Sequence, residues 1–160
     1  MKLRNMTSIY LLCGEEILLL YRQGSRVANL SYISSAGGHM EEGELNHPRK
    51  AMLRELGEEL GLDETVLKGL ALRYVTQRLT KGEVRQIYYY FAEIEDKNLV
   101  GESSEGELHW VKLDAACSLP MPVTAKHMLE HYIREGRFTD HLYAGATTPD
   151  GMVFTVLEEF

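Results

Sequence analysis

Cysteine is scarce in this 160-residue chain. Cys13 and Cys117 are the only two, both in apolar contexts, and their separation does not match a metal-binding motif. A disulfide framework of the kind that stabilises small secreted proteins is therefore not expected, and a reducing compartment fits. We predict a cytoplasmic protein.

Long apolar runs and an excess of positive charge are also missing. An apolar stretch follows Lys2 and Arg4, but Glu15 and Glu16 interrupt it and no small-residue cleavage site follows, so neither a secretory signal nor a membrane span is predicted. The formal net charge is -7 and the pI is about 5.4. An extended polyanion would be repelled, so we expect no nucleic-acid polymer as a partner.

Repeats, linkers and low-complexity tracts are absent too, and 44% of the residues are hydrophobic. This length and composition can bury one good core, so residues 1–160 are expected to form a single domain. Strand and helix signals alternate irregularly, which predicts an α/β (α+β) fold with a mixed sheet between helical layers.

The expected elements follow from periodicity and turn residues. Strands are predicted at 8–13, 16–22, 70–78, 84–93 and around 109–111, with a loop over 23–35. Helices are predicted at 47–60, with Asn46 as a favourable N-cap and Gly61 as C-cap, and from Thr124 as N-cap to just before Gly136. A C-terminal hairpin is predicted over 142–157, about the turn at Pro149.

The first of these helices carries an unusual acidic stripe. Glu55, Glu58 and Glu59 share one face at about 100° per residue, and leucines occupy the opposite face. Like charges at these spacings cost about 0.2–0.5 kcal/mol each, and Gly57 in mid-helix costs roughly 1 kcal/mol. A solvated acidic face is the simpler interpretation, but the preceding glycine pair and Arg54 favour a site for a hard divalent cation.

These residues resemble the sequence box of the Nudix hydrolase superfamily, and of its MutT-type members. The box requires Gly, five residues, Glu, seven residues, and then Arg-Glu-apolar-x-Glu-Glu-x-Gly-apolar. Gly38 and Glu44 have the required spacing, and 54–62 match the final nine positions. Two departures occur: nine residues rather than seven separate Glu44 from Arg54, and Ser35-Ala36 stand where the family usually has proline. The extra length is expected in the loop before the helix, because Pro48 is tolerated only in a first helical turn.

The resemblance implies the fold predicted above and a set of roles. Glu55, Glu58 and Glu59 would hold Mg²⁺ or Mn²⁺, with the Gly37 carbonyl as a possible further ligand. Glu44 and Arg54 would pair and orient the helix against the Gly37-Gly38 loop. The metal would neutralise the diphosphate and activate water, and a glutamate would accept the proton.

Other assignments are weaker, and each has a structural alternative. Downstream acids are candidates for the general base or an extra metal ligand, unless they form a solvated turn: Glu102, Glu105 and Glu107. Substrate contacts are expected from Arg22 and Arg26, unless they are surface charges, and from Tyr88 and Tyr90, unless the tyrosines of that strand only pack. The C-terminal hairpin could cap the site or form the edge of a homodimer.

The predicted function is metal-dependent hydrolysis of the pyrophosphate linkage in a nucleoside diphosphate linked to another group. Nucleoside triphosphates, including oxidised ones, are favoured, as in MutT-type members. A catalytically silent nucleotide-binding module is the alternative. A remote one is a zinc protease, because His127, Glu130 and His131 match His-x-x-Glu-His. Isomerase chemistry on the same fold needs a cysteine setting that neither Cys13 nor Cys117 provides.

Overall fold

The computed structural model describes residues 1–22 and 32–160. The strands are β1 (Lys2–Cys13), β2 (Glu16–Arg22), β3 (Tyr32–Ser34), β4 (Ala36–His39), β5 (Lys68–Thr80), β6 (Glu83–Glu93), β7 (Glu107–Lys112), β8 (Leu142–Thr148) and β9 (Gly151–Leu157). The α-helices are α1 (Pro48–Leu60) and α2 (Val123–Arg134). Short 3₁₀ segments are η1 (Glu42–Glu44), η2 (Glu64–Val66), η3 (Lys97–Leu99), η4 (Leu113–Ser118) and η5 (Gly136–Phe138).

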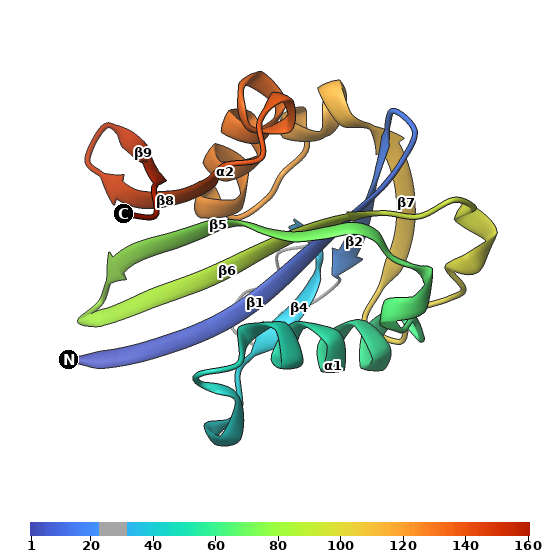
Figure 1. The fold of residues 1–160 in the computed structure, drawn as a ribbon, viewed down its shortest axis with the longest axis horizontal. Helices are drawn as coiled ribbons and strands as arrows, with labels where there is room; N and C mark the ends of the chain where they lie inside the picture. The colour runs from blue at the N-terminus through green and yellow to red at the C-terminus, as the bar shows by residue number, and fades with distance from the viewer. Residues whose placement is uncertain (23–31) are drawn as a thin grey trace.

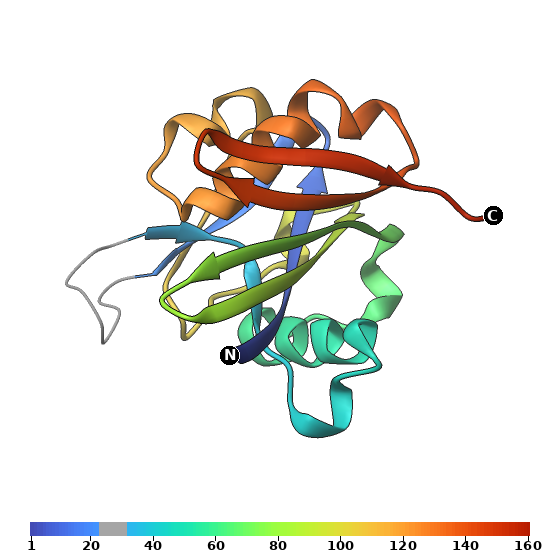
Figure 2. The ribbon, with the colours of Figure 1, turned by 90° about the vertical axis from the view of Figure 1, so that its left-hand side faces the viewer.

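The strands form one mixed sheet in the order β3-β2-β1-β6-β5-β8-β9, with β4 on β1 and β7 on β2. Pairs β1–β6 and β5–β8 are parallel, and the other strand pairs are antiparallel. Helix α1 covers one face and α2 the other (Figures 1 and 2). The predicted mixed α+β architecture, including the hairpin β8–β9, is confirmed.

Two hydrophobic clusters follow from this layering, because successive strand residues point to opposite faces. Tyr10 of β1 belongs to the cluster under α2, whereas its neighbours Ile9 and Leu11 belong to the cluster under α1. Both faces of β1 are covered, so residues 7–12 are buried without interruption.

Two helix starts differ from prediction. Helix α1 begins at Pro48 with His47 as N-cap and no capping side chain, so Asn46 is not the cap. Helix α2 begins at Val123 after Pro122, and Thr124 lies inside the first turn, 6% exposed, rather than capping it. In both cases a proline, with its fixed φ, sets the helix entry in place of a polar side chain. The predicted end of α1 is confirmed, since Gly61 has a φ of 65°.

The segment 32–39 also differs, because the predicted loop contains β3 and ends beside the strand β4. One edge of β1 is divided between two partners: Met6 to Ile9 pair with β4, and Leu12 and Cys13 pair with β2. Strand β3 pairs with the far end of β2. Segment 32–39 therefore crosses from β2 to β1 where these two strands diverge.

Gly37 makes this crossing possible. Its φ is 151°, and a Cβ placed on it would lie 2.1 Å from the Thr7 carbonyl oxygen. No residue with a side chain fits there unless β4 separates from β1.

We therefore expect Gly37→Ala to lower the free energy of unfolding by at least about 2 kcal/mol. The control Gly43→Ala meets nothing within 4 Å, so its effect should stay within about 0.5 kcal/mol. Urea unfolding measures both, and equal stability of the two variants would contradict the close approach.

Candidate active site

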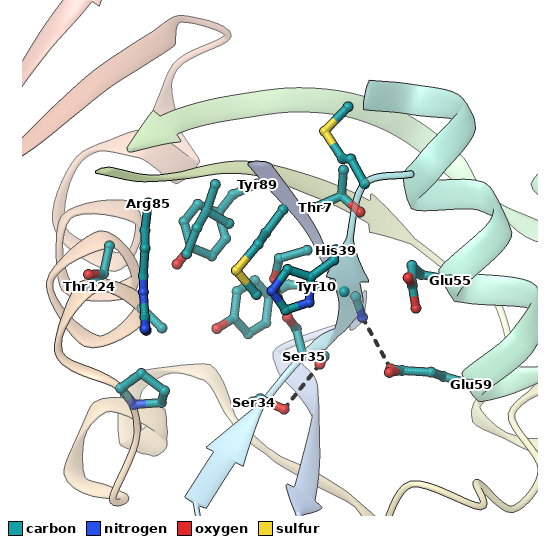
Figure 3. A pocket seen from close by; sticks show the side chains of 18 of the residues that line it. Thr7, Tyr10, Ser34, Ser35, His39, Glu55, Glu59, Arg85, Tyr89 and Thr124 are labelled. Carbon is teal, nitrogen blue, oxygen red and sulfur yellow. Dashed lines mark hydrogen bonds between the residues drawn. The ribbon is translucent and has the colours of Figure 1, made fainter. Parts of the chain in front are cut away.

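A cavity of about 800 Å³ lies between α1 and the start of α2. Figure 3 shows Glu55 and Glu59 on one side of it and Arg85 with Thr124 on the opposite side. The volume is in the range of small-ligand pockets. The carboxylates of α1 and the Arg85 guanidinium thus lie on opposite sides of one cleft.

Glu59 lies at the acidic end and is only 7% exposed. One carboxylate oxygen accepts a hydrogen bond from Arg22 at 2.8 Å, and the other accepts one from the Gly37 N–H at 3.1 Å. Burial raises the pKa of Glu59, and these two donors oppose the shift. Glu59 is therefore not part of a solvated acidic face, because this part of α1 packs against β4.

Arg54 organises the region next to Glu59. Its Nε and Nη2 each donate to a different oxygen of Glu44 at 2.9 Å, and Nη2 also donates to the His39 carbonyl at 3.1 Å. Its Nη1 contacts Glu55 at 2.9 Å and Glu58 at 3.2 Å. The predicted pair with Glu44 is therefore present despite the longer spacing, and residues 45–47 precede the helix.

The buried Glu44 carboxylate is 3% exposed and depends on this partner. The hydrogen bonds from Arg54 lower the pKa of Glu44 to about 2. The group therefore stays ionised in the folded protein at all ordinary pH values.

The three acids assigned to the metal do not form a ready-made cage. Glu55 lies against Gly38, where a Cβ would come within 2.5 Å of its carboxylate, and the Glu58 side chain is 59% exposed. Within residues 1–22 and 32–160, no three Asp, Glu, His or Cys side chains converge closely enough to hold a metal. Converting this arrangement to a metal site requires side-chain rotation.

A cation nevertheless already bridges the relevant oxygens. Besides Glu59, the Arg22 guanidinium donates to the Gly37 carbonyl at 3.4 Å and to Glu105 at 3.3 Å, and its Nε donates to Ser34 at 2.9 Å. Carboxylate and carbonyl oxygens are the donors that Mg²⁺ and Mn²⁺ prefer. The donor set therefore fits a divalent ion, which would have to replace Arg22.

Only some of the residues predicted as a base or as substrate contacts line the cavity. Arg22 and Glu105 line the cavity, while Glu102 and Glu107 do not. Arg26 lies outside the described residues. The assignment of Tyr88 and Tyr90 to the cleft is wrong, because both side chains join the cluster under α1. Their neighbour Tyr89 lines the cavity instead.

Sequence reasoning missed three further groups of cavity residues: Tyr10 and Tyr89, Ser34 and Ser35, and Arg78 and Arg85. Strand alternation separated the tyrosines into two sets but could not tell which set faced the cleft. The arginines belong to strand ends that come together only through the β1–β6–β5 pairing.

The zinc-protease pattern does not form a site. His131 is 6% exposed and its Nδ1 lies 2.8 Å from the Tyr74 hydroxyl, while His127 contacts Glu130 at 3.4 Å. The described part of the chain gathers no third ligand around them. Burial lowers the pKa of His131. Burial also raises the pKa of the Cys117 thiol to about 11, which disfavours a reactive thiolate.

These features define a mixed α+β protein with an acid-lined cleft. The family model for the NUDIX domain matches residues 2–132. The chain therefore belongs to the Nudix family and is a pyrophosphohydrolase acting on acid anhydrides. Members of this family act on small nucleotide-type substrates and generally use divalent metals.

Solved structures show the same fold. A MutT protein from Bacillus halodurans has a TM-score of 0.68 and 24% identity, covering 96% of this chain and 97% of its own. The ORF135 protein of E. coli has a TM-score of 0.70 and 22% identity, covering 88% and 96%. An Ap4A hydrolase from C. elegans has a TM-score of 0.62 and 20% identity, covering 84% and 96%. Comparison with curated proteins found no match.

Within residues 1–22 and 32–160, no helix combines the length and apolar character needed to span a membrane.

The Glu44–Arg54 pair gives a prediction about pH. Because the folded pKa of Glu44, about 2, lies below its ordinary value of 4.5, the pair stabilises fully above about pH 4.5 and progressively less toward pH 2. Glu44→Gln should cost about 3 kcal/mol at pH 7, since Arg54 loses its buried partner.

The difference between wild type and Glu44→Gln should shrink as the pH falls from 4.5 to 3, as measured by urea unfolding. The exposed neighbour Glu42 supplies the control, Glu42→Gln, which should show little difference at any pH. A Glu44→Gln deficit that stays constant with pH would contradict the assigned pKa.

Proposed function

We propose that this chain hydrolyses the pyrophosphate linkage of a nucleoside diphosphate joined to another group, with Mg²⁺ or Mn²⁺ as cofactor. The observation that carries the proposal is the buried Glu59 carboxylate, held by Arg22 and the Gly37 N–H at the acidic end of the cleft. A buried carboxylate paired with one displaceable cation is suited to exchanging that cation for a metal ion.

The residues that would hold the metal are Glu59, Glu55, Glu58 and the carbonyl of Gly37. When bound, such an ion neutralises phosphate charge and lowers the pKa of an attacking water. Arg54 would hold Glu55 and Glu58 in position through its Nη1, while Glu44 fixes Arg54 itself. This is how partners behind the ligands orient metal sites in general.

The chain also supplies a proton acceptor and a phosphate contact. Glu58 and Glu105 line the cavity with side chains 59% and 50% exposed, so either carboxylate can reach a water and accept its proton. Glu102 does not line the cavity, so we do not propose it as the base. Arg22, once displaced from Glu59, would remain beside the bridge and bind a phosphate oxygen.

Nucleoside triphosphates, including oxidised ones, are the first substrates to screen, because the similar structure from Bacillus halodurans is that of a MutT protein. A catalytically silent nucleotide-binding module is the rival, and the retained glutamates count against it. A panel of nucleotides with Mg²⁺ or Mn²⁺, analysed by mass spectrometry, decides between the two: hydrolysis of none of them would favour the rival.

We infer a single domain over residues 1–160 in the cytoplasm, with no nucleic-acid or membrane partner. Strand β9 ends the sheet order and exposes Val153 and Leu157, so we place the edge of a homodimer there.

Glu59→Gln should reduce kcat by at least about 100-fold, because the amide cannot supply a negative oxygen to the metal. The fold should persist, since an amide oxygen can still accept from the Gly37 N–H. Steady-state hydrolysis with circular dichroism tests this, with exposed Glu158→Gln as control. Turnover near that of wild type would remove Glu59 from the proposed site.

Arg22→Gln should bind Mn²⁺ several-fold more tightly than wild type while hydrolysing substrate more slowly. The reason is that the variant loses a cation that competes for Glu59 and the Gly37 carbonyl. Titration of free Mn²⁺ by electron paramagnetic resonance gives the affinity without catalysis, and Arg134→Gln, an exposed arginine on α2, is the control. Unchanged or weaker Mn²⁺ affinity would contradict the competition.

A further inference from the structure

Three arginines form a row across adjacent strands at the end of the cleft opposite the acids. Arg4 of β1 is in register with Arg85 of β6, and Arg85 is in register with Arg78 of β5. Residues paired in this way project from the same face of a sheet. Arg78 and Arg85 line the cavity, and Figure 3 shows Arg85 reaching along the side that Thr124 of α2 also borders.

The row is short of negative charge. Both Arg4 and Arg85 contact the same Glu83 oxygen, at 3.0 and 2.8 Å, and in the described ranges no other carboxylate forms an ion pair with any of the three. Arg4 also contacts the ring of His39, which carries no negative charge to offset it. Like charges directly opposite one another destabilise a sheet, so three cations sharing one anion, in a chain of net charge -7, form a site suited to an external anion.

An anion bound by the arginine row would lie away from the pyrophosphate bridge, which the proposed function places at the acidic end of the cleft. Gly37, Ser8 and Tyr89 lie at one level of the sheet, since Ser8 is paired with both of the others. Arg85 lies four residues from Tyr89 along β6, which is about 13 Å at the usual rise per residue. The long arginine side chains can shorten that distance. An anion bound to them would still lie farther from the acidic end of the cleft than the part of the substrate next to the pyrophosphate bridge.

The intervening wall is aromatic. Tyr10 and Tyr89 line the cavity, and their rings are nearly parallel, with centroids 6.3 Å apart. Both tyrosines are almost fully buried, at 1% and 2% exposed, so they form the base of this wall, and the part-exposed Met6 and Ile87 line the cavity beside them. An apolar wall of this kind suits the base or ribose of a nucleoside, and the arginine row would then lie next to a group attached to the far side of that nucleoside.

We propose that Arg78 and Arg85, supported by Arg4, form a second anion subsite that binds a phosphate attached to the ribose of the substrate nucleoside. This rests on the proposed function for the place of the bridge. The subsite favours dinucleotides and conjugates that carry a 2′- or 3′-phosphate over plain nucleoside triphosphates, whose phosphates all lie at the 5′ end.

The test compares compounds that share a bridge and differ by one phosphate. NADP⁺ and NAD⁺ differ at the ribose 2′ position, and coenzyme A and dephospho-coenzyme A differ at the 3′ position. Calorimetric titration of the full chain in EDTA prevents metal-dependent hydrolysis and measures binding alone. Wild type should bind at least one phosphorylated partner about tenfold more tightly than its match, as charge-assisted hydrogen bonds would give. The pair that shows the preference identifies the position of the phosphate.

Variants locate the effect. The double variant Arg78→Gln/Arg85→Gln should bring the affinity ratio close to one, whereas Arg78→Lys/Arg85→Lys should keep part of it and added salt should reduce it. Arg137→Gln, an arginine outside the cavity lining, is the control and should keep the full ratio. Equal affinities within both pairs in wild type, or a ratio unchanged in the double glutamine variant, would overturn the subsite.

The same compounds separate this proposal from the proposed function. A preference in EDTA, together with no hydrolysis of these compounds or of the nucleotide panel in Mg²⁺ or Mn²⁺, would support the subsite and overturn the proposed hydrolysis. Hydrolysis of both members of each pair with equal affinities would do the reverse.

Discussion

The guanidinium of Arg54 joins the three segments on which the cleft depends. It contacts Glu44 at the end of η1, the His39 carbonyl at the end of β4, and Glu55 and Glu58 on α1. Desolvating such a pair is costly, and the cost is offset only when nearly every donor and acceptor is satisfied. Arginine meets that condition because its planar fork presents five N–H donors, whereas lysine offers one ammonium without the bidentate geometry. The acids of α1 are therefore positioned by a network that does not itself require a bound metal.

A second constraint comes from the sheet. Strands β1 and β2 share only two residue pairs before they diverge, and segment 32–39 occupies the opening. This arrangement brings the backbone of Gly37 between Arg22 and Glu59, and it places the cleft where the sheet is least regular. The acidic end is built from this opening and α1, while the basic end is built from the regular part of β1, β6 and β5. The polarity of the cleft thus reflects the two kinds of sheet structure that border it.

Much of the architecture was readable from local signals in the sequence. Helix α1, its end at Gly61, the long strand β6 and the hairpin β8–β9 all follow from periodicity and turn residues. The short strands β3 and β4 escaped detection, because they are three and four residues long and β4 contains two glycines. Within the site, the Glu44–Arg54 pair was expected from the resemblance to the Nudix box, but the burial of Glu59, the choice of Tyr89 over Tyr88 and Tyr90, and the arginine row were not predictable. Each of these depends on which face of a strand or helix meets a distant segment, and a local pattern does not contain that information.

The parallel pairing of β1 with β6 has a consequence for how the chain folds. Every partner in this ladder is 81 residues away along the chain, from Lys2 with Glu83 to Leu12 with Glu93. Closing so large a loop is entropically costly, and topologies dominated by such pairs fold slowly. During synthesis, the apolar stretch 9–12 must wait for residue 93 to leave the ribosome before its ladder is complete, and until then it exposes an aggregation-prone segment. The yield of folded protein is therefore expected to depend on how well this stretch is kept from associating with other chains before β6 has been made.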